Sequence, residues 1–181
     1  MLPPGHIAAG FLTAEALLHF THPSLIASQQ THLLWWGMFF SFAPDLDMFY
    51  SFAREKAFEV RDFKKNNHRK FISHAPLLWM LGGLAIYFIS GSEYFKILGL
   101  LLWLCSWSHF ILDSIEYGIM WLWPFSKRSW ALKDPAVDKE NNGENFFKYW
   151  LNFLKSYSKT WTFYAEIIIL ISSLFFLITI H

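Results

Sequence analysis

Residues Lys96–Asp113 read KILGLLLWLCSWSHFILD. The segment is apolar between its two charged ends, and it is long enough to cross a bilayer, which takes roughly 17–25 residues of helix. Its end contains His109 and Asp113, which are four residues apart and therefore share one face of a helix. The segment predicts a membrane helix with ionisable side chains at one end.

The composition of the whole chain agrees with this interpretation. Of its 181 residues, 54% are hydrophobic, 20% are aromatic and only 16% are charged, whereas a soluble domain carries roughly 25% charged residues. This balance disfavours a disordered chain, a secreted disulfide scaffold and an ordinary cytosolic enzyme. We predict an all-α, polytopic helical integral membrane protein that forms a single membrane domain over residues 1–181.

Four further segments are candidates for membrane crossings. Ala75–Gly91 and Thr160–Ile180 are nearly free of charge, whereas His6–Phe20 and Leu33–Tyr50 are weaker, because both carry ionisable residues and Pro44 breaks the second. We interpret the two weaker segments as a helical hairpin with Thr21–Thr31 as its turn. Together with the first segment they predict about five transmembrane helices.

The basic residues predict how these helices are oriented. Ser51–Ser73 and Ser126–Lys159 each contain seven Lys and Arg residues, and such an excess marks the cytoplasmic side. The N-terminus is then cytoplasmic, and residues 1–130, 131–159 and 160–181 are a core, a cytoplasmic loop and a last crossing. Orientation alone explains the charges, and binding of anionic headgroups would be an added role. The interleaved acidic residues disfavour a nucleic-acid partner.

Ionisable side chains inside membrane segments are costly, and this topology gathers eight of them in the cytoplasmic half. Singly, each has a plain structural explanation. Asp45 after Pro44 is a typical helix cap, and His109 with Asp113 is a typical hydrogen-bonded pair. Their common depth favours one shared site instead. The eight residues are His6, Asp45, Asp47, His68, His74, His109, Asp113 and Glu166.

Imidazole and carboxylate side chains are the ligands that zinc, manganese and iron prefer. We therefore predict one or two divalent metal ions, with zinc first and manganese or iron as alternatives. Two ions about 3.5–4 Å apart would activate water for a hydrolytic displacement. The predicted metal ligands are His6, Asp45, Asp47, His68, His74, His109 and Asp113.

Three residues are predicted to take part in catalysis. Arg69 follows His68 and is suited to bind a phosphate or carboxylate oxygen. Asp47 is a catalytic candidate as well as a ligand. Glu166 is interpreted as a ligand, as a base, or as the partner of a basic residue.

The order of these residues resembles that of a known family. The motifs that carry the resemblance occur in this order: His6 with Gly10, the box Pro44–Asp47, His68-Arg69 followed by His74, His109–Asp113, Gly118 and Trp123–Ser126. Over residues 1–130 this set resembles the YdjM-like family of inner-membrane, metal-dependent hydrolases. The resemblance implies a bacterial or archaeal inner-membrane protein with a hydrolase site at the seven predicted ligands.

The chain departs from the pattern of that family at two positions. Ala75 stands where Ser is frequent, and Glu116 lies where Thr is frequent. A substrate contact that depends on a hydroxyl group is therefore not predicted here.

Two functions follow from these observations. The first is a membrane-embedded hydrolase that uses metal-activated water on a phosphoester of a lipid at the cytoplasmic leaflet, with an acyl ester or amide as other bonds. The alternative is a metal- or proton-binding transport or structural protein without turnover. Beyond Glu15, His19 and Glu93 the outer half is poor in ionisable groups, which favours the hydrolase. Neither the substrate nor the oligomeric state is predicted further.

Overall fold

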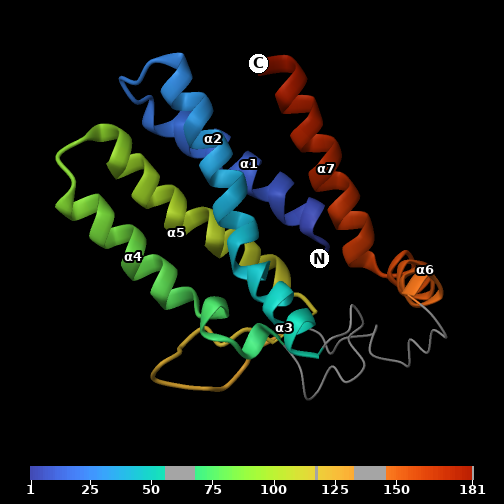
Figure 1. Ribbon diagram of the computed structural model, residues 1–181. Coiled ribbons are helices and arrows are strands. Elements are labelled where there is room, and N and C mark those ends of the chain that lie inside the picture. The colour runs from blue at the N-terminus through green and yellow to red at the C-terminus, as the bar shows by residue number, and fades with distance from the viewer. Residues whose placement is uncertain (56–67, 117, 133–145, 181) are drawn as a thin grey trace.

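The computed structural model describes residues 1–55, 68–116, 118–132 and 146–180, and its architecture is helical, as predicted (Figure 1). A single isolated antiparallel bridge, between Ile119 and Trp130, is the only strand pairing within these ranges. The α-helices are α1 (Pro3–Thr21), α2 (Ala27–Phe42), α3 (Asp47–Glu55), α4 (Pro76–Ile89), α5 (Glu93–Asp113), α6 (Phe146–Tyr157) and α7 (Trp161–Ile180). Three 3-10 turns join them: η1 (Ala43–Leu46), η2 (His68–Lys70) and η3 (Ile72–His74).

Two of the predicted crossings coincide with helices long and apolar enough to span a bilayer by length and composition. They are α5 and the stretch Trp161–Thr179 of α7. Helix α4 is apolar but shorter, with 14 residues. The total of five crossings stays a prediction. Helix α6 lies inside the segment that we predicted as a cytoplasmic loop.

The predicted crossing Leu33–Tyr50 is interrupted at Pro44, as the sequence indicated. Helix α2 ends at Phe42, the turn η1 follows, and α3 begins at Asp47. Pro44 explains the break, because proline has no N–H to donate to the preceding turn and its ring clashes with the carbonyl four residues earlier. The hairpin turn is also shorter than predicted. His22 ends α1 in the left-handed conformation, at φ 42°, and its N–H donates to the Leu18 carbonyl at 3.1 Å.

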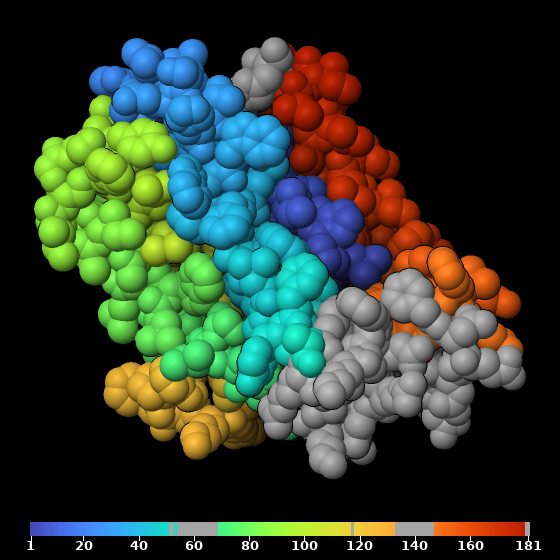
Figure 2. All heavy atoms as spheres, in the orientation of Figure 1, coloured from blue at the N-terminus to red at the C-terminus, as the bar shows by residue number. Residues whose placement is uncertain are grey.

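Helix α5 packs against α1, α2 and α4. Its apolar residues Leu101 and Cys105 are fully buried together with Ala14 of α1 and Leu33 of α2. Helix α7 packs against α1, and Figure 2 shows α1 as a narrow band between α2 and α7. The start of α1, the turn η1 and the end of α5 meet at one end of the molecule, which is where the ionisable residues gather.

Helices α4 and α5 approach closely where glycines face each other. A Cβ atom built on Gly99 would lie 2.5 Å from the Gly83 carbonyl oxygen, and one built on Gly83 would lie 2.9 Å from the Trp103 Cβ. Backbone atoms cannot yield as a flexible side chain can, so these two positions require glycine. Small residues commonly allow membrane helices to pack this closely.

We expect Gly83→Ala to lower stability by about 1–3 kcal/mol, because the added methyl group overpacks the contact between α4 and α5. The matched control is Gly82→Ala on the same helix, where the Cβ would meet only the Leu102 Cδ2 at 3.6 Å. This control should be neutral or slightly stabilising, since alanine favours helix. Thermal unfolding in detergent measures both variants, and equal midpoints would contradict the packing described.

Candidate metal centre

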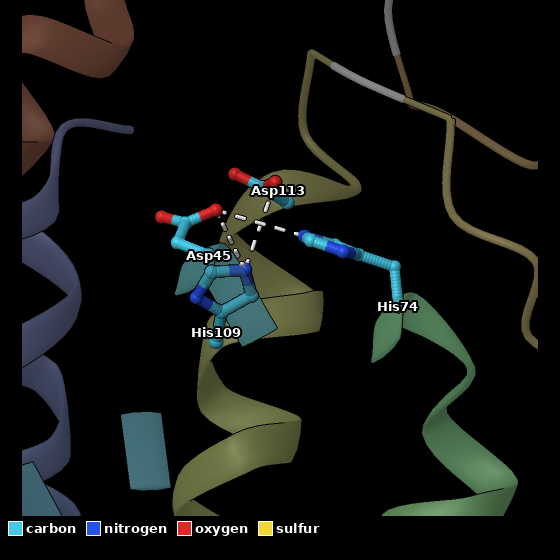
Figure 3. Close-up of side chains that lie close together, drawn as sticks. All are labelled: Asp45, His74, His109 and Asp113. Carbon is cyan, nitrogen blue, oxygen red and sulfur yellow. Dashed lines mark ion pairs between the residues drawn. The ribbon is translucent and has the colours of Figure 1, made fainter. Parts of the chain in front are cut away.

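Four buried side chains from three elements converge at one end of the helical bundle (Figure 3). Asp45 comes from η1, His74 from η3, and His109 and Asp113 from the last turns of α5. One nitrogen or oxygen atom from each lies within 4.8 Å of all the others. We call these four residues the His/Asp group.

Local sequence explains why each member points inward. His109 and Asp113 are four residues apart on one helix and so share a face. Asp45 follows Pro44 in the break between α2 and α3, which turns the chain into the bundle. His74 lies two residues before the start of α4 at Pro76, and two indole N–H groups hold that start. Trp79 Nε1 donates to the Ser73 carbonyl at 2.7 Å, and Trp107 Nε1 donates to the Pro76 carbonyl at 3.0 Å.

The spacing within the His/Asp group fits a metal ion better than direct hydrogen bonds. Asp45 Oδ1 lies 3.6 Å from His74 Nε2 and 3.7 Å from His109 Nε2, and His109 Nε2 lies 3.8 Å from Asp113 Oδ2. Hydrogen bonds between such atoms are usually 2.7–3.2 Å long. By contrast, two ligands that each sit about 2.1 Å from a tetrahedral ion lie roughly 3.4 Å apart.

Burial strengthens this interpretation. His109 Nε2 is buried and has no hydrogen-bond partner among the described residues. A buried nitrogen lone pair without a partner is costly, and a metal ion would satisfy it. The two nitrogens and two carboxylates therefore fit a divalent ion of the kind that His and Asp bind.

The other nitrogen of each histidine is held by the protein. His109 Nδ1 lies 2.8 Å from the Ser41 carbonyl, and His74 Nδ1 lies 2.9 Å from Asp47 Oδ2. A carbonyl or carboxylate oxygen only accepts, so each Nδ1 carries a proton, and in the neutral ring the lone pair of Nε2 points toward the group. Metal-binding histidines are commonly oriented in this way. The Ser73 hydroxyl also donates to Asp47 Oδ2 and holds that carboxylate in place.

The neighbouring carboxylates affect the protonation of His74, which lies just before α4. Burial on its own lowers the pKa of His74. Asp45 and Asp47 overcome this effect by stabilising the charged ring, and the pKa is raised above its usual value. A metal ion that binds His74 Nε2 would have to displace the proton that this nitrogen carries in the charged ring.

His6 borders the His/Asp group from α1. Its Nε2 lies 3.3 Å from Asp113 Oδ1, and its ring stacks on that of His109 with 3.9 Å between the centroids. The side chain is fully buried, and neither ring nitrogen has a hydrogen-bond partner among the described residues. His6 thus lies at the edge of the group, and its predicted role as a metal ligand stays a prediction.

Asp113 also contacts two cations. Arg69 Nε donates to its Oδ2, and the terminal ammonium of Met1 lies 3.2 Å from its Oδ1. Both cations favour the ionised carboxylate. The structure therefore places Arg69 on a member of the group, and its predicted role in binding an anionic substrate stays a prediction.

Besides His6, Asp47 and Arg69, two more predicted site residues are not among the four of the His/Asp group, namely His68 and Glu166. His68 lies in η2, but its side chain is outside the described residues. Glu166 of α7 is buried and accepts from the backbone N–H groups of Leu2, at 3.3 Å, and Gly5, at 3.2 Å, and from the Tyr157 hydroxyl. It therefore caps the start of α1, where a helix favours negative charge. Its predicted catalytic role stays a prediction.

Sequence reasoning missed two polar contacts that position these elements. The Ser41 carbonyl, which orients His109, is a main-chain group and carries no signal in the sequence. Glu116 is buried and accepts from the Thr162 hydroxyl at 2.7 Å, so it ties the end of α5 to the start of α7. The position of Glu116 just after an apolar segment was the one feature of the sequence that could have indicated this buried contact.

Comparison with known proteins agrees with the resemblance found in the sequence. The model of one family, described as YdjM inner membrane protein, matches residues 1–181. The match therefore extends beyond residue 130, where the resemblance in the motifs ended. Among curated proteins and solved structures there is no match.

We expect the purified protein to hold about one divalent ion per chain, because the His/Asp group offers one four-ligand cage. His109→Ala should abolish this content, whereas His32→Ala, which changes an exposed histidine, should leave it unchanged. Elemental mass spectrometry after dialysis against each ion measures both. A wild-type protein that stays metal-free after reconstitution with zinc, manganese and iron would refute the metal centre.

We expect Asp47→Asn to weaken metal binding about 10- to 100-fold without abolishing it, since Asp47 orients His74. Asparagine keeps the shape of the side chain but loses the charge that supports the Nδ1 proton. Competition with a fluorescent chelator gives the affinity. An Asp47→Asn variant that binds metal as tightly as the wild type would show that the contact between Asp47 and His74 does not serve the centre. Ser73→Ala should weaken metal binding less than Asp47→Asn does.

Proposed function

This chain belongs to the YdjM inner membrane protein family, and on that premise we propose that it is a membrane-embedded, metal-dependent hydrolase. The observation that carries the proposal is the His/Asp group, in which two oriented histidines and two carboxylates are buried together within 4.8 Å. Burying two carboxylates in an apolar bundle is costly unless cations compensate them. A divalent ion explains why the residues occur together.

The chain's own residues would prepare such a centre in three ways. Ser41 and Asp47 hold the imidazole rings of His109 and His74, so little reorganisation is required on binding. Arg69 keeps Asp113 ionised. The apolar walls of the bundle exclude bulk water and strengthen every charge interaction inside. When bound, the ion supplies Lewis-acid chemistry and generates a nucleophile from water near neutral pH.

The substrate that we propose is a phosphoester of a lipid in the cytoplasmic leaflet. The His/Asp group lies at the end of α5, which is long and apolar enough to span a bilayer, so a substrate could approach from the membrane surface. Arg69 brings a guanidinium to the edge of the group, and guanidinium is well suited to phosphate oxygens. A lipid acyl ester or amide would use the same centre.

One observation favours the alternative function, which is metal or proton transport. A cavity of about 780 Å³ lies along α1, away from the start of that helix. Its lining includes Glu15 and His19 together with the apolar residues Leu34 and Phe176. Because His6 lies on the same helix, ionisable groups occur at both ends of α1, as a transport path would require.

We expect the metal-loaded protein in proteoliposomes to hydrolyse a phospholipid, with products detected by mass spectrometry of the extracted lipids and phosphate. Asp45→Asn and His109→Ala should each reduce the rate by more than about 100-fold, because they remove ligands. The exposed-site control His32→Ala should retain full activity. Chelation should abolish the reaction, and added metal should restore it.

The same vesicles test the transport alternative. A fluorescent indicator trapped inside them reports entry of the metal. Flux without lipid hydrolysis, lost in Glu15→Gln and His109→Ala, would establish transport and refute the hydrolase. Neither flux nor hydrolysis over a panel of phospholipids, with metal bound, would leave a structural centre and refute the proposed function.

A further inference from the structure

Helix α6 presents three distinct faces around its axis. One face is turned toward the protein. Tyr149 and Tyr157 are buried there, and Phe153 stacks on Tyr157 with 5.9 Å between ring centroids. The Tyr157 hydroxyl donates to Glu166 of α7. These contacts place α6 against the start of α7 in a defined rotation, so the directions of its other residues are defined too.

A second face is apolar and exposed. Phe147, Leu151 and Leu154 are 82%, 66% and 47% exposed. Their spacing of four and three residues aligns them in one row along the helix. We call these three residues the α6 stripe. Large apolar side chains aligned in this way usually mark a surface that contacts another apolar medium.

The third face is basic and adjoins the α6 stripe. At about 100° per residue, Lys148 and Lys155 lie roughly 90° from the middle of the stripe and opposite the buried tyrosines. Both lysines are exposed, as is Lys159 just beyond the helix. An apolar row flanked by lysines is typical of helices that lie in a membrane surface and contact anionic lipids.

The position of α6 agrees with such a location. It ends at Tyr157, and α7, which is long and apolar enough to span a bilayer, begins at Trp161. In Figure 1, α6 is seen end-on whereas α7 is seen from the side, so the axes of the two helices meet at a steep angle. If α7 crosses the bilayer, α6 runs along its surface. Trp161 is about half exposed at this junction, and tryptophan is enriched at membrane interfaces.

We propose that α6 is an interfacial helix, whose stripe enters the cytoplasmic leaflet and whose lysines bind anionic phospholipid headgroups. The partner is the lipid surface itself. The proposal rests on the exposure and spacing of residues in α6 and not on the His/Asp group. It therefore stands or falls separately from the hydrolase.

Spin labels at single cysteines test where the stripe lies. Cys105 is buried and is the one cysteine of the chain, so Cys105→Ala provides a clean background. Leu151→Cys labels the middle of the stripe, and Leu154→Cys with Lys155→Cys forms a matched pair, because successive residues lie about 100° apart around a helix. In nanodiscs of phosphatidylcholine and phosphatidylglycerol, we expect the labels at 151 and 154 to collide with oxygen and to be shielded from a water-soluble nickel complex. The label at 155 should show the reverse.

Two outcomes would overturn the proposal. Equal exposure of the labels at 154 and 155 to the nickel complex would place the stripe in water. Dipolar broadening between labels at 151 on different chains would instead make the stripe an interface between copies. If the background variant fails to fold, a bimane probe at position 151 makes the same distinction through the quenching of its fluorescence by brominated lipids. Cys105 is then retained as an unlabelled buried thiol.

The lysines are tested by changing the lipid. In nanodiscs with phosphatidylglycerol, Lys148→Gln combined with Lys155→Gln should increase nickel access to the label at 151 by at least a few fold. In phosphatidylcholine alone, the double variant should match its parent. The control is Lys127→Gln combined with Arg128→Gln, which removes two exposed charges elsewhere. No difference in nickel access between the two double variants would refute the role of anionic headgroups.

Discussion

The cost of burying carboxylates among apolar helices governs the arrangement of this molecule. Asp113 is fully buried, and an isolated charge there would be strongly destabilising. Its neighbours compensate the charge: Arg69 and the Met1 ammonium pair with its two oxygens, and the His6 ring lies beside it. The end of α5, the start of α1 and the turn η2 are thereby drawn to the same place. A metal ion would extend this compensation to Asp45.

Proline residues supply the backbone that this arrangement needs. Pro44 ends α2 and lets η1 turn Asp45 into the bundle, while Pro76 begins α4 two residues after the end of the turn that carries His74. Non-helical backbone at membrane depth is tolerated where it is buried in protein or lines a polar site. The breaks and the ionisable residues therefore belong together. Each would be costly alone, and each makes the other tolerable.

Part of the site could be predicted from the sequence because part of it is local. His109 and Asp113 are four residues apart on an apolar helix, and Asp45 follows a proline, so these side chains could be singled out as candidates from the sequence. The Ser41 carbonyl was not, since any residue supplies that atom. Glu166 was assigned to the site by depth, whereas its contacts are with the start of α1. A common depth in a membrane restricts residues along one axis only, and it does not tell which helices lie next to each other. Helix α6 was missed because its exposed apolar row lies within a charged segment.

The His/Asp group takes its members from positions 45, 74, 109 and 113, so it does not exist in any single helical hairpin. It forms only when the α1–α2 and α4–α5 pairs have docked. An ion that binds this arrangement, and binds the separated hairpins poorly, stabilises the docked state by mass action. The centre would then report correct assembly. A chain inserted with its hairpins undocked would therefore lack the ion, and the metal content of the protein would distinguish the two states.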